Sequence, residues 1–83
     1  MIDHPVKHPQ QLAPLIRAMR RQAGLSQAAL ALRLGVSHQA ISQLEKQPER
    51  VTVERLMRVL SALKIDLVLR PRTVATTSNT GDW

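Results

Sequence analysis

The stretch from His38 to Lys46 mixes apolar residues with side chains that can form hydrogen bonds. If its apolar residues share one face of a helix, the other face presents His38, Gln39, Ser42, Gln43 and Lys46. A glutamine can bond adenine through two hydrogen bonds in the major groove of DNA, which is wide enough to admit a helix. Gln39 and Gln43 are therefore the candidates for reading base edges.

Neighbouring polar residues favour contacts of other kinds. Ser37, His38 and Ser42 are candidates either for further base contacts or for contacts to phosphates. Gln27 is predicted to begin an earlier helix, where the backbone N–H groups of a helix N-terminus can point at phosphate. The basic residues predicted to neutralise phosphates are Arg20, Arg33, Lys46 and Arg50.

The charge of the chain favours a polyanionic partner. Twelve Lys and Arg against six Asp and Glu among 83 residues give a net charge of +6 at pH 7. A small basic domain attracts nucleic acid, an anionic membrane surface or an acidic protein, and charge alone does not choose among them. The longest uncharged apolar run, residues 28–32, is far too short to span a bilayer, so we expect a soluble, cytoplasmic protein.

The residues give little support to catalytic or metal chemistry. The chain has no cysteine, its serines lack a Gly-x-Ser-x-Gly context, and its three glycines form no phosphate-binding loop. His4 and His8 are four residues apart, but Pro5 and Pro9 oppose the helix that would align them as metal ligands. We expect no enzymatic activity, no metal and no cofactor.

The polar face of residues 38–46 must be positioned by other helices, of which the first lies near the N-terminus. Its start is expected near Gln11, because Pro14 is tolerated only within the first turn, and Gly24 ends it. Apolar residues at helical spacing are predicted to face inward: Leu12, Leu15, Ile16, Met19 and Ala23.

Three further helices share one start signal. Ser26, Ser37 and Thr52 are each predicted to cap a helix, and each has an apolar residue one position before it and another four after it. The predicted helices span residues 27–34, 38–46 and 53–63, with a loop at residues 47–50. The residues of the last helix that are predicted to face inward are Leu56, Met57, Leu60 and Leu63.

The segment 27–46 meets the steric requirements of a DNA-binding helix-turn-helix. Ala31 is small where the two helices cross, and Gly35 lies at the turn, where a positive φ favours glycine. The residues predicted to lock the two helices together are Leu30, Leu34, Val36, Ile41 and Leu44. Because such a unit also occurs purely for packing or protein contacts, the basic charge is the second argument for DNA binding.

Beyond the last helix the apolar pattern changes to a period of two. Residues 65–70 predict a strand, which could pair with the N-terminal segment "MIDHPV" or, as we prefer, with its own copy in a homodimer. We therefore divide the chain into an N-terminal arm at 1–10, a helix-turn-helix domain at 11–64, a dimerisation strand at 65–70 and a flexible, disordered tail at 71–83.

The stretch "LIRAMRRQAGLSQAALALRLGVSHQAISQLE" resembles the helix-turn-helix of phage-repressor-like proteins, the class of the lambda and 434 repressors. The resemblance implies an all-α fold of four or five helices. With the basic composition, the strand after the last helix and a polar tail that ends in tryptophan, the chain is most similar to HipB-type antitoxins. This similarity implies a homodimer whose C-terminal strands pair with each other. It also implies that the dimer represses its own operon at a palindromic operator and binds a HipA-like serine/threonine kinase toxin.

The tail ends in Trp83, the only aromatic residue of the chain. Tryptophan dominates binding energy where it enters a partner's pocket, and the tails of HipB-type antitoxins also end in tryptophan, so Trp83 is predicted to bind the toxin. The alternative is a stand-alone or phage-type repressor without a toxin partner. In either case we expect the protein to be nucleoid-associated when it is bound to its operator.

Overall fold

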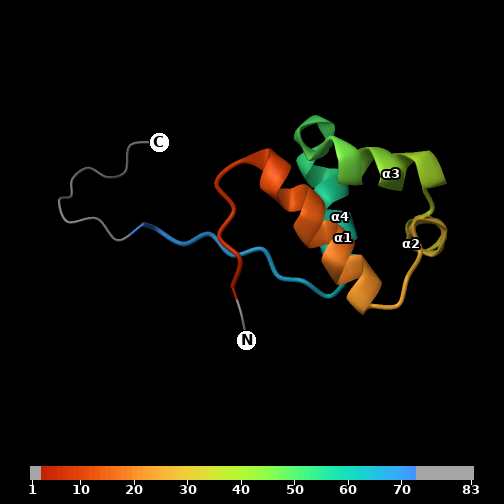
Figure 1. Ribbon diagram of the computed structural model, residues 1–83, viewed down its shortest axis with the longest axis horizontal. Helices are drawn as coiled ribbons and strands as arrows, with labels where there is room; N and C mark the ends of the chain where they lie inside the picture. Colours follow the sequence, from red (N-terminus) through yellow and green to blue (C-terminus); the bar gives the residue numbers. More distant parts are fainter. Residues whose placement is uncertain (1–2, 73–83) are drawn as a thin grey trace.

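The computed structural model describes residues 3–72, and within them the fold is all-helical, as predicted. In this part of the chain, four α-helices and two short 3-10 turns follow one another without a sheet (Figure 1). Their bounds are η1 Pro9–Gln11, α1 Leu12–Gln22, α2 Gln27–Leu34, α3 His38–Lys46, η2 Pro48–Arg50 and α4 Val53–Ala62.

Hydroxyl side chains begin α2, α3 and α4, as the sequence predicts. The oxygens of Ser26 and Ser37 accept hydrogen bonds from the backbone N–H groups three residues ahead, both at 3.0 Å, and that of Thr52 does so at 3.1 Å. Each cap satisfies a backbone donor that the first turn of a helix leaves without a partner. α2 and α3 therefore have the predicted bounds.

Gly24, Gly35 and Lys64 end α1, α2 and α4 in the same way. Their φ angles are all positive, at 75°, 72° and 61° respectively. The residue that follows each of them donates a backbone hydrogen bond across the last turn of the helix. Lys64 is the departure from the expected pattern, because a side chain in this left-handed conformation costs free energy that glycine avoids. The turn ends α4 at Ala62, one residue before the predicted end.

The core contains most of the residues predicted to face inward, and it adds Val59, which was not predicted to do so. Ile16, Leu30, Ile41 and Val59 are among the fully buried residues, together with Leu44. Two residues that were predicted to face inward are instead exposed. Ala23 lies beyond the last turn of α1, and Met57 lies off the face of α4, whose packed positions are Leu56, Val59, Leu60 and Leu63, at the spacing of one helical stripe.

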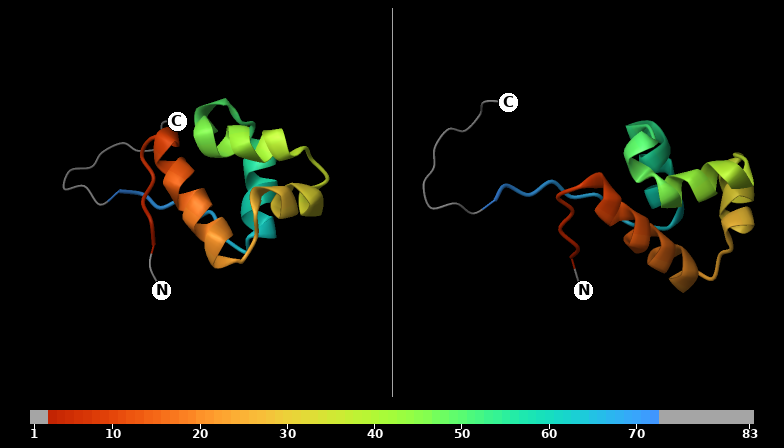
Figure 2. Two further views of the ribbon diagram at one scale, coloured as in Figure 1. Left: turned by 45° about the vertical axis from the view of Figure 1, so that its right-hand side comes forward. Right: turned by 45° about the horizontal axis from the view of Figure 1, so that its top comes forward.

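The predicted strand is not formed within the single chain: residues 65–72 have no regular secondary structure. They run past the N-terminal arm, and Arg70 contacts Asp3 there at 3.4 Å, but no backbone hydrogen bond joins residues 3–6 to residues 65–70 (Figures 1 and 2). Pairing with the arm is thus not observed in the described chain, and pairing with a second copy stays a prediction. The predictions for residues 73–83, including Trp83, lie outside the described residues.

Among the helices of residues 3–72, none is both long enough and apolar enough to cross a bilayer.

Candidate nucleic-acid interface

The turn between α2 and α3 has the geometry predicted for a helix-turn-helix. Gly35 has a φ of 72°, and Val36 donates a backbone hydrogen bond to the carbonyl of Ala31 at 3.0 Å. Ala31 is buried where the two helices pack. Arg58 of α4 donates a hydrogen bond to the carbonyl of Leu34 at 2.7 Å, so a charged side chain satisfies the C-terminal end of α2.

The outer face of α3 carries the predicted polar residues. His38, Gln39, Gln43 and Lys46 are exposed, and Ser42 is half-buried beside them. α3 lies along one edge of the molecule, with its first turn next to α2 and its last turn next to η2 and α4 (Figure 1). A helix that protrudes in this way with polar side chains on its outer face can enter a major groove.

Some of these side chains already have partners within the protein. The Ser37 hydroxyl accepts the hydrogen bond that caps α3, and the amide nitrogen of Gln43 donates to the amide oxygen of Gln47. Gln43 is exposed and Gln47 is half-buried, so the Gln43 amide can contact a base only if it exchanges this hydrogen bond. Gln39 has no hydrogen bond through its side chain within the described residues, so its amide is available.

Gln27 and His38 are brought together at the start of α2 and α3. The Gln27 amide oxygen lies 3.0 Å from His38 Nε2, and the Gln27 amide nitrogen donates to Glu45 Oε1 at 3.0 Å. The side chain of Gln27 is therefore turned toward α3, and its predicted phosphate contact would use the free backbone N–H groups of the helix N-terminus.

Arg33 is separate from this cluster. It is exposed in the last turn of α2, six residues after Gln27, which corresponds to about 9 Å along a helix axis. Lys46 and Arg50 are exposed at the other end of α3 and in η2. These basic residues therefore flank the polar face at both ends rather than gathering at one point.

The prediction that Arg20 contacts a phosphate is wrong. Its side chain is only 9% exposed, and it binds Glu45 of α3 through two hydrogen bonds, from Nε to Oε2 at 2.6 Å and from Nη2 to Oε1 at 3.1 Å. Nη1 donates to the carbonyl of Leu25 at 3.0 Å. Arg20 therefore joins α1, α3 and the loop before α2, and it is not available to DNA.

A signal for this pair was present in the sequence. Arg20 lies four residues after Ile16, and Glu45 lies four residues after Ile41, so each charge shares the buried face of its helix. Charges on buried faces are almost always paired, and these two have opposite sign. The second arginine near Glu45 is Arg17, whose Nε lies 3.7 Å from Oε1.

The carboxyl group of Glu45 stays ionised in this position. Burial raises its pKa, but the hydrogen bonds from Arg20 and Gln27 and the charges of Arg20 and Arg17 lower it more, so the net pKa is below the ordinary value. Glu45 therefore acts only as a hydrogen-bond acceptor at neutral pH.

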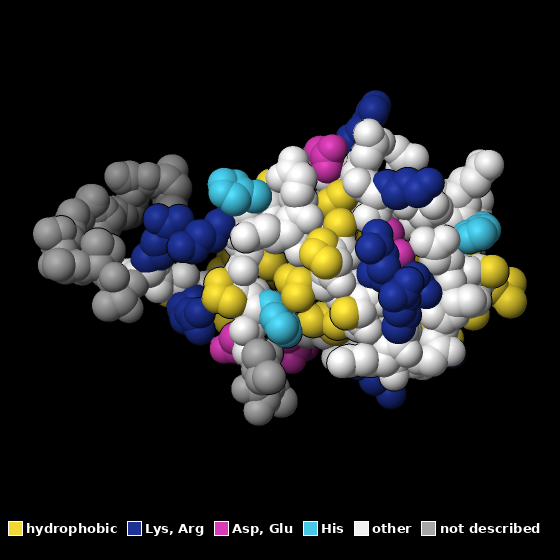
Figure 3. All heavy atoms as spheres, viewed as in Figure 1, with side chains coloured by type: hydrophobic (Ala, Val, Ile, Leu, Met, Phe, Trp, Pro, Cys, Tyr) yellow, Lys and Arg dark blue, Asp and Glu magenta, His cyan; other side chains and the backbone are white. Residues whose placement is uncertain are grey.

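On the face drawn in Figure 3, Lys and Arg side chains form a band over α1 and the adjoining part of α3, while hydrophobic side chains gather toward the N-terminal arm. Lys46 is exposed in the last turn of α3, so one basic side chain lies at the end of the polar face itself. Within the described residues, no group of three or more His, Cys, Asp or Glu side chains is arranged to hold a metal ion.

Comparisons with known proteins agree with this geometry. A helix-turn-helix family matches residues 16–69. The antitoxin HipB of Escherichia coli strain K12 is 31% identical over 61 residues, which cover 74% of this chain and 69% of that protein.

Two solved structures also superpose on most of the chain. A HipB-O1-O2 complex has a TM-score of 0.77 at 28% identity, with 83% of this chain and all of that chain covered. A HipA-HipB-O2-O3 complex has a TM-score of 0.79 at 27% identity, with 86% of this chain and all of that chain covered.

Proposed function

Because the chain belongs to the helix-turn-helix family and, within it, to the HipB-type antitoxins, we propose that this DNA-binding antitoxin represses its own operon and neutralises a HipA-like serine/threonine kinase. The observation that carries the DNA-binding part is the exposed polar face of α3, presented by a turn at Gly35 and bordered by basic side chains. A protein of this kind acts by binding, and we assign it no catalytic step.

In the proposed complex, α3 lies in the major groove. Gln39 and Gln43 contact base edges, and Ser37, His38 and Ser42 add base or phosphate contacts at the first turns of the helix. The start of α2 at Gln27 faces a phosphate through its backbone N–H groups. The side chains proposed to neutralise phosphates at the two ends of this face are Arg33 and Lys46.

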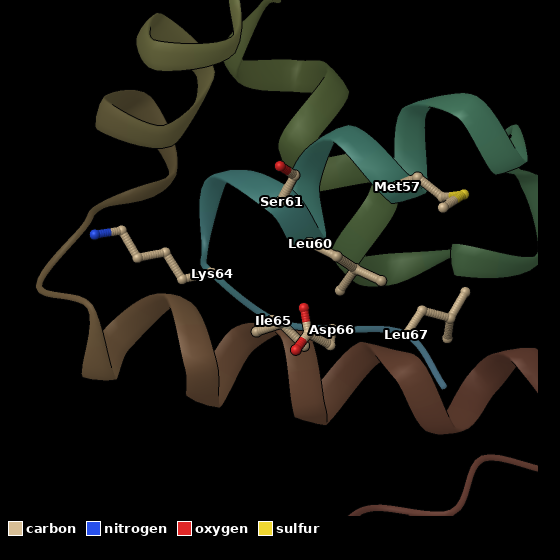
Figure 4. Close-up of a pocket in the computed structure, with 7 residues that line it drawn as sticks. All are labelled: Met57, Leu60, Ser61, Lys64, Ile65, Asp66 and Leu67. Carbon is tan, nitrogen blue, oxygen red and sulfur yellow. The ribbon is translucent and has the colours of Figure 1, made fainter. Parts of the chain in front are cut away.

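We further propose that the chain acts as a homodimer on a palindromic operator. α4 and the segment after it form a groove of about 360 Å³, lined by Met57, Leu60, Ile65 and Leu67 among others (Figure 4). Met57 is 50% exposed, and Leu69 beyond the groove is 90% exposed, which leaves apolar surface open to water in the single chain. Pairing of residues 65–70 with their copy would cover this surface and satisfy the open backbone groups.

The proposed toxin partner is a HipA-like kinase, because the HipA-HipB-O2-O3 complex contains a similar chain beside HipA. We assign Trp83 to this contact and the helix-turn-helix to DNA, so that the two partners use different parts of the chain. The alternative is a repressor without a toxin, which would use the same face of α3. DNA binding in either case places the protein with the nucleoid in the cytoplasm.

Binding measurements with two duplexes test the DNA-binding role. The upstream region of the protein's own operon and a scrambled duplex of equal length are titrated at several salt concentrations. We expect tighter binding to the first, with an affinity that falls steeply with salt because each neutralised phosphate contributes about −0.9 to the log–log slope. Equal affinity for both duplexes would contradict the proposed repressor.

Co-expression with the kinase-like protein encoded nearest to the gene tests the second role. We expect co-purification of the two proteins and relief of the kinase's toxicity. A chain that binds its operator but neither binds nor neutralises that kinase would support the stand-alone repressor instead.

A further inference from the structure

A chain of hydrogen bonds runs from the buried interior to the polar face of α3. Arg20 binds Glu45, Glu45 accepts from Gln27, and Gln27 meets His38 at the exposed start of α3. Arg20 and Glu45 are buried, Gln27 is half-buried and His38 is exposed. Of these four residues, only His38 and Gln27 lie at the surface proposed to face DNA.

The chemistry of Glu45 decides how the Gln27 amide is oriented. An ionised carboxylate only accepts hydrogen bonds, and the guanidinium of Arg20 only donates them. The atom of Gln27 that faces Glu45 Oε1 at 3.0 Å must therefore be its amide nitrogen. The amide oxygen of Gln27 is left to face His38.

The orientation of the Gln27 amide in turn selects one form of the His38 ring. An amide oxygen accepts hydrogen bonds and does not donate them, so His38 Nε2 at 3.0 Å must carry a proton. In the neutral ring the proton is then on Nε2, and Nδ1 is the acceptor. Nδ1 has no hydrogen-bond partner among the described residues, so it is the ring nitrogen available to an outside group.

We propose that Glu45 is a positioning residue for DNA recognition: acting through Gln27, it holds the neutral His38 ring in the Nε2–H form and presents Nδ1 as an acceptor at the start of α3. This inference rests on the proposed function, and it specifies the group that His38 recognises. In the major groove, acceptors of this kind meet the amino group of adenine or cytosine, whereas guanine offers only acceptors there. His38 therefore selects a base-edge amino group.

The state of the ring is measured without DNA. In protein with ¹⁵N-labelled histidine, at a pH where the ring is neutral, the two ring nitrogens have different chemical shifts when one of them is protonated. We expect His38 to be held in the Nε2–H form. A proton on Nδ1, or rapid exchange between both forms, would overturn the proposal.

Two variants separate positioning from folding. Arg20→Met combined with Glu45→Met removes the carboxylate but leaves no unpaired buried charge, so the fold is expected to persist. Gln27→Met removes the link itself and keeps the buried pair. In both variants we expect His38 to exchange between the two neutral forms, and an unchanged Nε2–H signal in the folded variants would overturn the proposal. If the double variant does not fold, Gln27→Met decides the same question.

A double-mutant cycle measures the consequence for DNA binding. Gln27→Met is expected to weaken operator binding about fivefold, the value of one neutral hydrogen bond. In a His38→Ala background the same change should weaken it less than about twofold, because Gln27 then has no ring to orient. Equal effects in both backgrounds would mean that Gln27 acts by its own DNA contact, and the proposal would fail.

Gln43→Ala is the matched control, because the Gln43 amide bonds Gln47 rather than this chain of hydrogen bonds. Its effect on binding should be the same with and without His38, and it should leave the His38 ring in the Nε2–H form. If the protein binds no DNA at all, the proposed function fails, whereas the Nε2–H form of the His38 ring can still be observed because it is measured without DNA. If it binds DNA but His38 exchanges freely, only the positioning role fails.

Discussion

Replacing Glu45 with alanine should strongly destabilise the protein, because it breaks a buried ion pair. The carboxylate is 1% exposed and accepts hydrogen bonds of 2.6 and 3.1 Å from Arg20 and of 3.0 Å from Gln27. Without it, the Arg20 guanidinium stays buried without a counter-charge, which costs about 3 to 5 kcal/mol. A chain of 83 residues has a free energy of unfolding of only about 4 to 12 kcal/mol, so the loss is a large share of the total.

Thermal unfolding followed by far-ultraviolet circular dichroism measures this effect, since the signal comes from the helices. For a domain of this size we expect Glu45→Ala to lower the Tm by at least about 12 °C. Glu49→Ala is the matched control, because Glu49 is exposed in η2, and it should change the Tm by little. A loss below about 1 kcal/mol for Glu45→Ala would refute the reasoning.

Glu45 should also make the free energy of unfolding depend on pH. The pKa of Glu45 is lowered in the folded protein, so the unfolded chain takes up a proton at a higher pH than the folded one. Its contribution is fully present above the ordinary glutamate pKa of about 4.3 and is lost as the pH falls through the lowered folded pKa. Glu45→Ala should show a smaller loss of stability between neutral and acid pH than the natural protein.

Four further predictions test other parts of the chain. Gln39→Ala should cost about 1 to 3 kcal/mol in binding to the operator and much less on random DNA, measured by titration of both duplexes. Lys64→Gly should raise the free energy of unfolding by about 0.5 to 1 kcal/mol, since glycine adopts the φ of 61° without strain; an unchanged Tm would argue against that strain. Met57→Glu places a charge on the proposed dimer surface and should shift the mass in sedimentation from dimer to monomer, while a natural chain that is already monomeric would refute the dimer. Deletion of Trp83 should leave operator binding and dimer mass intact while weakening neutralisation of the kinase, and undiminished neutralisation would remove its assigned role.

The helices could be predicted closely because their signals are local. Ser26, Ser37 and Thr52 satisfy donors within their own first turns, and Gly35 relieves a steric clash with its own backbone. Such signals need no knowledge of the rest of the fold. The bounds of α2 and α3, and with them the polar face of α3, followed from the sequence for this reason.

What could not be predicted depends on how the helices pack. Whether Met57 or Val59 faces the core depends on the rotation of α4 against its neighbours, and a stripe with several apolar residues permits both choices. Arg20 was predicted to contact DNA because its charge suits phosphate. Its place on the buried face of α1 indicates a paired charge, but only the approach of α3 toward α1 identifies Glu45 as the partner. The hydrogen bond between Gln27 and His38 joins two helices in the same way.

The apolar surface and the polar surface lie on different parts of the molecule, and this separation bears on how two copies could bind one operator. Residues 65–72 leave the helical body on the side away from α2, whereas His38 begins α3 next to α2 (Figures 1 and 2). A dimer formed through residues 65–70 would therefore leave both copies of α3 open, and it would set the distance between them. Adjacent half-sites on one face of DNA repeat about every 34 Å, so only a pairing that holds the two α3 helices near that spacing supports the proposed repressor. Inserting two residues after Lys64 should keep the dimer, because residues 65–70 can pair with their copy as before. The longer link between α4 and the strand changes the spacing of the two α3 helices, so binding to the natural operator should weaken more than binding to a single half-site.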